Sequence, residues 1–126
     1  MTLFGETGLS GDVIAAAIAV HRELGPGLDE PQYELALVTQ RDAMRIAHVI
    51  QCGLPLRYKG VKLDCGYKID VLVEDKLVLE LKSVERATDL HQAQLLTYLR
   101  LSGRKLGLLL NFNVPAMKDG FTWLVL

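Results

Sequence analysis

Two short alternating runs near the middle of the chain constrain its fold more than any other feature. Apolar and branched residues recur at every second position in residues 67–73 and again in residues 77–82, a pattern typical of β-strands. Only Glu74-Asp75-Lys76 separates the two runs, and this length suits a hairpin loop. If these three residues form the loop, Val73 pairs with Leu77. The sequence therefore predicts an antiparallel hairpin.

This register brings two carboxylates together. Asp70 falls opposite Glu80, and Lys82 lies two residues further along, on the same side of the sheet. Facing carboxylates repel each other by about 0.2–1 kcal/mol in water, and by more when they are buried. A divalent cation between them would turn that repulsion into coordination. The alternative is a solvated strand face on which the three side chains form a surface ion pair.

A cation held by two such carboxylates supports a particular chemistry. Mg²⁺ or Mn²⁺ can orient a water molecule and polarise a phosphodiester. Lys82 could lower the pKa of that water or stabilise the charge that develops on the phosphate. The three residues therefore indicate a metal-dependent phosphodiesterase if they lie together.

Composition is that of a globular protein rather than a disordered one. Half of the 126 residues are hydrophobic and mean hydropathy is +0.22. The longest apolar run, Val13 to Val20, is far shorter than the roughly 20 residues that span a bilayer. No basic segment precedes an apolar run at the start, so we expect no signal peptide and no membrane association. The net charge of −1 counts modestly against a dedicated nucleic-acid binder.

The two cysteines give a further indication of the compartment. Cys52 and Cys65 match no zinc spacing. Without a secretory signal they suggest two reduced thiols. We therefore expect a cytoplasmic protein.

Periodicity and turn residues predict the other elements. We expect a loose N-terminal arm over residues 1–9, then a single domain over residues 10–126. Ser10 is the expected N-cap of the first helix, and Thr88 or Asp89 that of the last, which Gly103 closes. The expected helices cover 10–24, 30–43 and 90–101; the expected strands cover 45–50, 56–58, 61–63, 67–73, 77–82, 106–112 and 121–126. This order predicts an α/β fold, a central mixed sheet with helices packed on it.

The last predicted helix carries polar side chains on one stripe. His91, Gln94 and Tyr98 lie at positions i, i+3 and i+7. Gln94 and Tyr98 can both reach a phosphate or a water near a metal. The alternative is that Tyr98 packs with apolar neighbours while Gln94 faces solvent.

The start of the second predicted helix carries an acidic group. Glu30 is stabilised there by the helix dipole, which alone could explain it. The functional interpretation directs Glu30 at the metal, with Tyr33 one turn on, supporting or contacting substrate.

His21 lies on the apolar stripe of the first helix, where a histidine is more often a core residue than a ligand. Five basic residues are scattered along the chain, and any of them could contact a phosphate backbone. The default interpretation is that they lie on the solvated surface. They are Arg41, Arg45, Arg57, Lys59 and Lys62.

Several stretches together resemble the GxxExxY protein family. They cover nearly the whole chain from about Ser10, and each is weak by itself. They are Val20-His21-Arg22-Glu23-Leu24-Gly25-Pro26-Gly27-Leu28-Asp29-Glu30-Pro31-Gln32-Tyr33, Tyr58-Lys59-Gly60-Val61, Gly66-Tyr67-Lys68-Ile69-Asp70, Leu79-Glu80-Leu81-Lys82-Ser83-Val84, His91-Gln92-Ala93-Gln94-Leu95-Leu96-Thr97-Tyr98-Leu99 and Asn111-Phe112-Asn113-Val114-Pro115. That family is similar to the RecB-like branch of the PD-(D/E)XK nuclease superfamily.

The resemblance implies a restriction-endonuclease-like fold and a role for each matching residue. It identifies Asp70 and Glu80 as the metal carboxylates and Lys82 as the catalytic lysine. The carbonyl of Leu81 becomes an extra metal ligand by superfamily analogy, and Glu30 becomes the upstream helical acid, acting directly or through water. Gln94 and Tyr98 match the Gln-x-x-x-Tyr element; His21, Tyr33 and His91 are supporting candidates. Pro31, directly after Glu30, departs from the small or polar residue usual there.

Three functions stay open at this point. The first is a Mg²⁺- or Mn²⁺-dependent nuclease acting on DNA. The second is a non-catalytic nucleic-acid-binding or protein-interaction module that keeps the fold. The third is metal-dependent chemistry on RNA or a nucleotide. A domain this small has little surface for holding a duplex, so a nuclease of this size is expected to form a homodimer or to rely on a partner protein.

Overall fold

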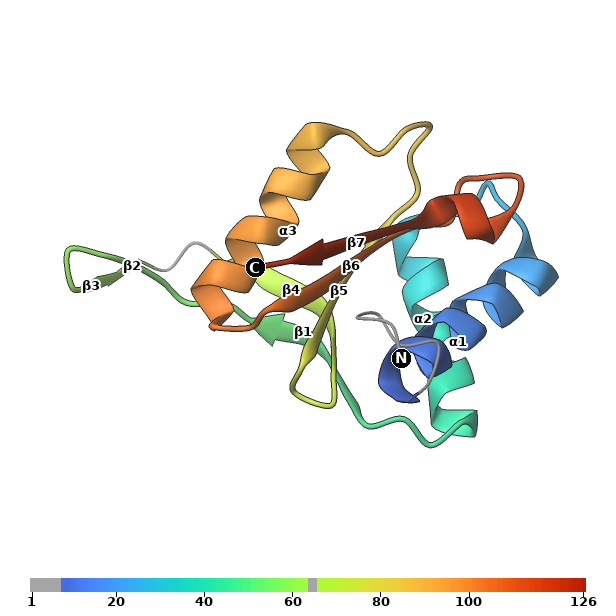
Figure 1. The fold of residues 1–126 in the computed structure, drawn as a ribbon, viewed down its shortest axis with the longest axis horizontal. Helices are drawn as coiled ribbons and strands as arrows, with labels where there is room; N and C mark the ends of the chain where they lie inside the picture. Colours follow the sequence, from blue (N-terminus) through green and yellow to red (C-terminus); the bar gives the residue numbers. More distant parts are fainter. Residues whose placement is uncertain (1–7, 64–65) are drawn as a thin grey trace.

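The computed structural model describes residues 8–63 and 66–126 and shows a mixed five-stranded sheet (Figure 1). The strand order is β1-β4-β5-β6-β7, with β5 and β6 parallel and the other neighbouring pairs antiparallel. These strands are β1 (His48–Gly53), β4 (Lys68–Val73), β5 (Leu77–Lys82), β6 (Leu106–Asn111) and β7 (Phe121–Val125). The predicted mixed sheet is therefore confirmed, and β5 is its central strand.

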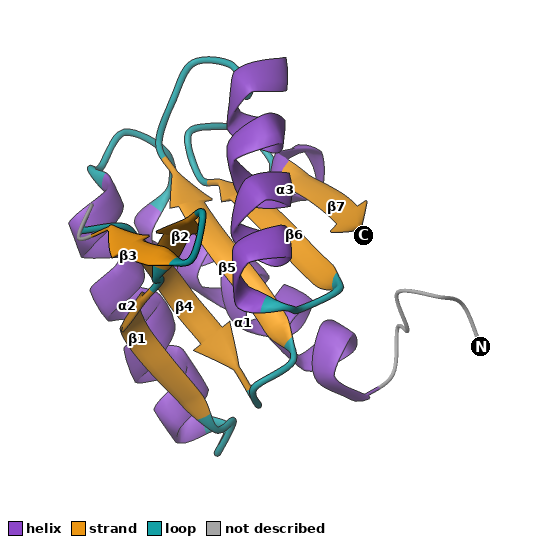
Figure 2. Cartoon of the chain, turned by 90° about the vertical axis from the view of Figure 1, so that its left-hand side faces the viewer, coloured by secondary structure: helices purple, strands orange, loops and turns teal. Residues whose placement is uncertain are grey.

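Helices cover both faces of this sheet (Figure 2). The helices α1 (Gly8–Leu24) and α2 (Glu30–Ala43) lie on one face, and α3 (Asp89–Ser102) lies on the other; a short 3-10 helix, η1 (Met117–Gly120), precedes β7. Buried apolar side chains form one cluster on each face. Leu79 of β5 belongs to the cluster below α1 and α2, whereas Val78 belongs to the cluster below α3. This alternation buries β5 on both faces, as expected for a central strand.

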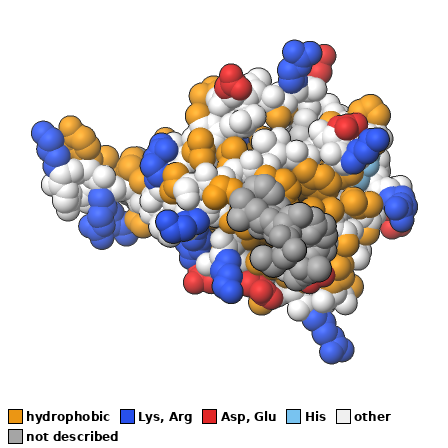
Figure 3. Space-filling model, viewed as in Figure 1, with side chains coloured by type: hydrophobic (Ala, Val, Ile, Leu, Met, Phe, Trp, Pro, Cys, Tyr) orange, Lys and Arg blue, Asp and Glu red, His pale blue; other side chains and the backbone are white. Residues whose placement is uncertain are grey.

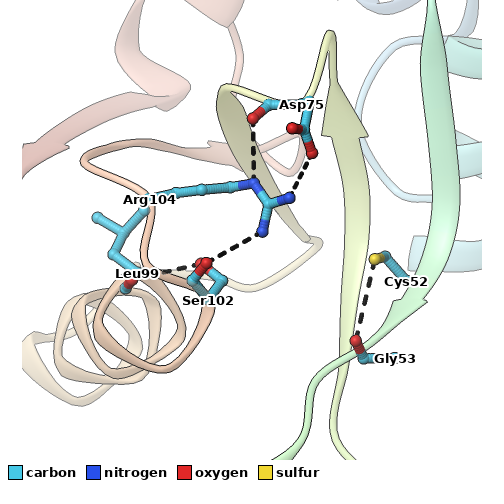
Figure 4. Close-up of polar contacts among 6 residues, drawn as sticks. All are labelled: Cys52, Gly53, Asp75, Leu99, Ser102 and Arg104. Atoms are coloured by element: carbon cyan, nitrogen blue, oxygen red, sulfur yellow. Dashed lines mark hydrogen bonds and ion pairs between the residues drawn. The ribbon is translucent and has the colours of Figure 1, made fainter.

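The hairpin of β4 and β5 has the predicted register. Val73 pairs with Leu77, and the ladder continues to Val71 and Leu79. Glu74 and Asp75 both have positive φ, +49° and +59°, which type I′ turns require and which non-glycine residues adopt at a cost. Arg104 holds this turn: its Nε donates to the Asp75 carbonyl at 3.1 Å, and its guanidinium pairs with the Asp75 carboxylate (Figure 4).

Two predicted elements, the first helix and the first strand, have a boundary that differs from the structure by more than one residue. The helix α1 begins at Gly8, so Ser10 is not its N-cap and the expected arm loses its last two residues; residues 1–7 lie outside the described residues. The strand β1 covers His48–Gly53 rather than residues 45–50. The segment after α2 instead turns: Arg45 has φ +60°, and the Ile46 amide donates to the Arg41 carbonyl at 3.0 Å.

A second, two-stranded sheet projects from the body of the molecule (Figure 1). It consists of β2 (Leu56–Tyr58) and β3 (Val61–Leu63), joined at Lys59-Gly60 as the sequence predicted. Both turn residues have positive φ. Nearby, Cys52 is a free thiol whose Sγ lies 3.9 Å from the Gly53 carbonyl (Figure 4). Cys65 lies outside the described residues.

Membrane insertion was not expected from the sequence. Among the residues that the structure describes, no helix is both long and apolar enough to cross a bilayer.

Candidate active site

Asp70 and Glu80 meet in the gap where β4 and β5 separate. The ladder between the two strands ends at Val71 and Leu79, one pair before them. The Asp70 amide donates to Oε1 of Glu80 at 3.3 Å, and the Leu81 amide donates to Oδ2 of Asp70 at 2.9 Å. Side-chain carboxylates therefore replace the next backbone pair of the ladder. The predicted opposition of Asp70 and Glu80 follows from this arrangement.

An irregularity in β4 directs the Asp70 carboxylate into this gap. Ile69 packs in the cluster below α3, whereas Val71 packs in the cluster below α1 and α2. Residues two apart on a regular strand share a face, so the strand twists at Asp70. Gln51, which lies opposite on β1, has φ +50°, and its pair is missing from an otherwise continuous register. Asp70 thus reaches along the sheet toward Leu81 rather than standing straight up from one face.

Glu80 is an acid in an unfavourable place for a negative charge. Its side chain is only 4% exposed. Burial and then the nearby charge of Asp70 raise the pKa of Glu80 to about 8, against smaller opposing effects of the Asp70 amide and of Lys82. The site therefore holds a proton, or the charge of a cation, more readily than it holds two bare carboxylates.

Lys82 begins a chain of hydrogen bonds that runs into α3. Its Nζ donates to Oε1 of Gln94 at 3.3 Å, and Nε2 of Gln94 donates to the Tyr98 hydroxyl at 3.2 Å. Burial raises the pKa of Tyr98, so its hydroxyl stays protonated at neutral pH and keeps a proton to donate. Gln94 therefore does not simply face solvent, and Tyr98 combines apolar packing with a polar contact.

Capping at the start of α3 fixes the helix that carries Gln94 and Tyr98. Thr88 is the N-cap: its hydroxyl accepts from the His91 amide at 3.4 Å. A second hydrogen bond runs in the reverse direction, because Nδ1 of His91 accepts from the Thr88 amide at 3.1 Å. Gly103, with φ +72°, ends the helix as predicted. The structure thus gives His91 a capping role on the helix that carries Gln94 and Tyr98.

Glu30, at the start of α2, lines an acidic cavity of about 420 Å³ that Asp70 also lines. Four carboxylates and no basic side chain line this cavity, together with polar and apolar residues: Asp29, Glu30, Pro31, Glu34, Gln51, Asp70, Leu81 and Ser83. Pro31 is accommodated in the first turn of α2 and does not displace Glu30. A cavity of this charge attracts cations and repels free anions.

The available donors suit a hard cation. Carboxylates and carbonyls are the oxygen ligands that Mg²⁺ and Mn²⁺ prefer. The half-buried Asp70 and the buried Glu80 place two carboxyl groups together, and a cation would compensate their negative charge. Within residues 8–63 and 66–126, however, no three His, Cys, Asp or Glu side chains lie close enough to hold a metal together. Glu30 shares the cavity with Asp70 without completing a three-carboxylate group.

Comparison with known protein families identifies the superfamily to which this fold belongs. The family model of the PD-(D/E)XK nuclease superfamily matches residues 7–123. The chain belongs to this superfamily. No curated protein and no solved structure gives a significant match. The mixed sheet with helices on both faces is the restriction-endonuclease-like architecture of PD-(D/E)XK proteins, whose nucleases generally use divalent metals.

Tyr33 positions the loop that leads to Glu30 in this PD-(D/E)XK domain. Its ring is buried and stacks on Phe112 at 4.5 Å between centroids. Its hydroxyl donates to the Gly25 carbonyl and accepts from the Leu28 amide at 3.2 Å. This burial favours the supporting interpretation of Tyr33 over direct contact with substrate.

Sequence reasoning missed two further polar residues that shape the site. The Ser83 hydroxyl donates to the Leu28 carbonyl and so ties the end of β5 to the same loop. Asn111 is buried; its amide donates to the Val84 carbonyl at 3.0 Å, and its oxygen accepts from the Val84 amide at 3.2 Å. Both lie inside motifs that resembled the family, and a conspicuous asparagine in an apolar strand was the available signal.

The structure separates His21 from the site. Its Nε2 lies 2.8 Å from the Val114 carbonyl, in contact with the loop after β6, and His21 does not line the acidic cavity. Its burial agrees with the structural interpretation of a histidine on an apolar stripe.

Arg41 is also buried rather than solvated, so the surface interpretation of this residue is wrong.

Proposed function

We propose that this PD-(D/E)XK protein is a Mg²⁺- or Mn²⁺-dependent nuclease that hydrolyses phosphodiester bonds in DNA. The observation that carries the proposal is the contact of Asp70 with Glu80 between separating strands, with Lys82 two residues further on. The membership of the superfamily supports the same chemistry. We further propose that the chain is a GxxExxY protein of the RecB-like type, because the Gln94–Tyr98 pair is linked to Lys82.

The proposed metal ligands are Asp70, Glu80 and the carbonyl of Leu81. The Lys82 carbonyl accepts from the Phe112 amide at 3.0 Å on the β6 side. Successive residues of a strand direct their backbone groups to alternate sides, so the N–H and C=O of Leu81 both point toward β4 and Asp70. Glu30 would add charge to the acidic shell through a bound water, since it shares the cavity without completing a three-carboxylate group.

The chain's own groups would then divide the chemistry. A bound Mg²⁺ or Mn²⁺ would acidify a water and neutralise the phosphate. Lys82 would donate to the phosphate oxygen on which charge develops, or would orient the attacking water. Oε1 of Gln94 accepts a hydrogen bond from the Lys82 ammonium and so fixes the direction of that side chain. Tyr98 would donate its hydroxyl proton to a phosphate oxygen or to a water at the site.

The proposal extends to the domain and its setting. Residues 10–126 would form the single nuclease domain, extended by the first turn of α1 at Gly8. The free thiol of Cys52 suits a reducing compartment, so we propose a cytoplasmic protein. A homodimer or a partner protein would supply further grip on a duplex.

The deciding experiment is a cleavage panel. Linear, nicked, single-stranded and branched DNA, with RNA for comparison, would be incubated with Mn²⁺ and purified protein. Wild type should cleave at least one DNA, EDTA should stop the reaction, and Glu80→Gln and Lys82→Met should each reduce the rate by about a hundredfold or more. The exposed acid Glu23 and lysine Lys118 supply matched controls, Glu23→Gln and Lys118→Met, which should cleave like wild type.

The alternatives give different results in the same panel. Cleavage of RNA alone would replace DNA as the substrate and leave the chemistry intact. Binding of DNA without cleavage by any preparation would favour the non-catalytic module. Cleavage that survives Lys82→Met at an unchanged rate would contradict the assigned role of Lys82.

A further inference from the structure

The hairpin of β2 and β3 carries side chains that the body of the protein leaves uncovered. We call residues 56–63 the wing. Apart from the half-buried Leu56 at its base, every wing residue is exposed, including Tyr58 at 63% and Val61 at 60%. An isolated two-stranded hairpin is marginally stable in water. The large apolar side chains of the wing are exposed to solvent, so they contribute little hydrophobic stabilisation. Such an element is expected to act by contacting something else.

The charge of the wing indicates what that partner is. Arg57, Lys59 and Lys62 place three cations on eight residues that contain no acid, in a chain whose net charge is −1. Figure 3 shows Lys and Arg side chains on the projecting part of the molecule, mixed with hydrophobic ones. The Lys59 ammonium lies 5.5 Å from the centre of the Tyr58 ring. The next acid in the sequence, Asp64, lies outside the described residues.

The wing leaves the body beside the Lys82–Gln94–Tyr98 chain. Leu56, at the base of the wing, lines a cavity of about 380 Å³ that Gln94 and Tyr98 also line. Tyr67, half-exposed in the same cavity, lies 6.2 Å from Tyr98 between ring centres. A strand of nucleic acid that reached Tyr98 would thus pass the foot of the wing.

The electrostatics of the two regions are complementary. The cavity at Asp70 and Glu30 is acidic and repels phosphate until a cation is bound. Affinity for a polyanion must then come from elsewhere on the molecule. The wing offers cations on a projecting, twisted two-stranded ribbon, a shape that fits along a phosphate backbone or into a groove.

We propose that the wing binds the sugar–phosphate backbone of the nucleic acid whose scissile phosphate occupies the candidate site. The inference deepens the proposed function, on which its choice of a nucleic acid rests. The wing would provide electrostatic affinity for the nucleic acid, and the residues where β4 and β5 separate would catalyse the reaction. Neutralising the wing should therefore weaken the binding of nucleic acid and leave the chemistry at the candidate site intact.

The test compares two triple variants that remove the same charge. Arg57→Gln/Lys59→Gln/Lys62→Gln neutralises the wing. The control, Lys76→Gln/Lys105→Gln/Lys118→Gln, neutralises three exposed lysines elsewhere and changes the net charge equally. Fluorescence anisotropy of labelled single- and double-stranded DNA, in EDTA and at several salt concentrations, measures binding without cleavage. Circular dichroism checks that each variant is folded.

The wing variant should bind at least about tenfold more weakly than wild type, and its slope of log K against log salt should be shallower by about 2 to 3. The control should keep the wild-type slope. Equal affinity and slope for the two triple variants would overturn the proposal. A wild-type dimer that the wing variant alone loses, with DNA affinity unchanged, would also overturn it and identify the wing as a self-association surface.

A second assay separates this outcome from failure of the proposed function. Hydrolysis of bis(p-nitrophenyl) phosphate with Mn²⁺ requires no polymer contact, so the wing variant should hydrolyse it at the wild-type rate. If wild type binds DNA through the wing but hydrolyses nothing, the proposed nuclease fails while the wing proposal holds. If the wing variant loses hydrolysis of this small substrate as well, the wing acts on the site itself, and the proposal of a separate grip is overturned.

Discussion

The Glu80 carboxylate lies against the backbone of Asp70, whose amide donates to Oε1 of Glu80 at 3.3 Å. The Asp70 carboxylate is in turn tied to the next residue of β5, accepting from the Leu81 amide at 2.9 Å. Each acid is thus oriented by the strand that carries the other. This exchange holds two carboxylates together without a basic side chain between them, and it makes the site sensitive to protons and to cations.

The first prediction concerns pH and stability. The pKa of Glu80 is raised from 4.5 to about 8 on folding, so the folded protein holds a proton that the unfolded chain releases. Stability therefore falls as pH rises from about 4.5 to about 8, by an amount on the order of a few kcal/mol, and the penalty is absent below this range. Glu80→Gln lacks the penalty and should become progressively more stable than wild type across it.

Urea denaturation followed by circular dichroism at several pH values measures this difference. Glu23→Gln, an exposed change on α1, should track wild type at every pH. Parallel stability curves for wild type and Glu80→Gln would show that Glu80 titrates as an ordinary acid.

The second prediction concerns metal. A cation that binds only the folded state should stabilise it by about 2.7 kcal/mol when present at a hundred times its Kd. Mn²⁺ should raise the melting temperature of wild type, and EDTA should reverse the effect. Asp70→Asn should lose this response because it removes one of the two carboxylates that meet in the gap. Asp12→Asn, at an exposed position on α1, is the control and should respond fully.

Binding of that metal should also release protons at neutral pH. A Glu80 carboxyl with a pKa near 8 must ionise before it coordinates, so Mn²⁺ affinity should rise with pH up to about 8. Calorimetric titrations in buffers of different ionisation enthalpy would reveal the released proton. A heat that does not depend on the buffer would place Glu80 outside the metal shell.

The sequence predicted the parts of this site that depend on regular periodicity. Alternation in β4 and β5 was sufficient to predict the pairing of Val73 with Leu77, because hairpin register follows from loop length. The observed ladder ends at Val71 and Leu79, one pair before Asp70 and Glu80. Alternation could not reveal the twist at Asp70, which lies across the sheet from the positive φ of Gln51 and turns the Asp70 carboxylate toward Leu81. Contacts such as Ser83 with Leu28 also escaped prediction, since they join residues 55 positions apart.

The third prediction concerns the polar chain on α3. Tyr98→Phe keeps the buried ring and removes only the hydroxyl that accepts from Gln94. Gln94→Leu removes the acceptor that orients the Lys82 ammonium. Both should lower kcat for DNA cleavage by about tenfold to a hundredfold while Mn²⁺ affinity is unchanged, since neither touches the carboxylates. Thr97→Val, one position away on α3, controls for changes in helix packing. A loss of metal binding in Tyr98→Phe would contradict this division of roles.

The last prediction concerns Arg41, which the sequence suggested was a surface cation. Its side chain is fully buried at the end of α2, and within the part of the chain that the structure describes its three guanidinium nitrogens have no hydrogen-bond partner. Burial lowers the pKa of Arg41 to about 10, yet the group still carries its charge at neutral pH. The neighbouring Asp42 carboxylate attracts this charge and offsets the effect of burial only in part. A buried charge that lacks hydrogen bonds opposes folding by about several kcal/mol.

Arg41→Met keeps most of the volume and removes the charge. It should raise the free energy of unfolding by about 1–4 kcal/mol, measured by urea denaturation at pH 7. Arg45→Met, at the exposed neighbouring arginine, should change it by less than about 0.5 kcal/mol. A lower stability for Arg41→Met would mean that the guanidinium makes a favourable contact in solution.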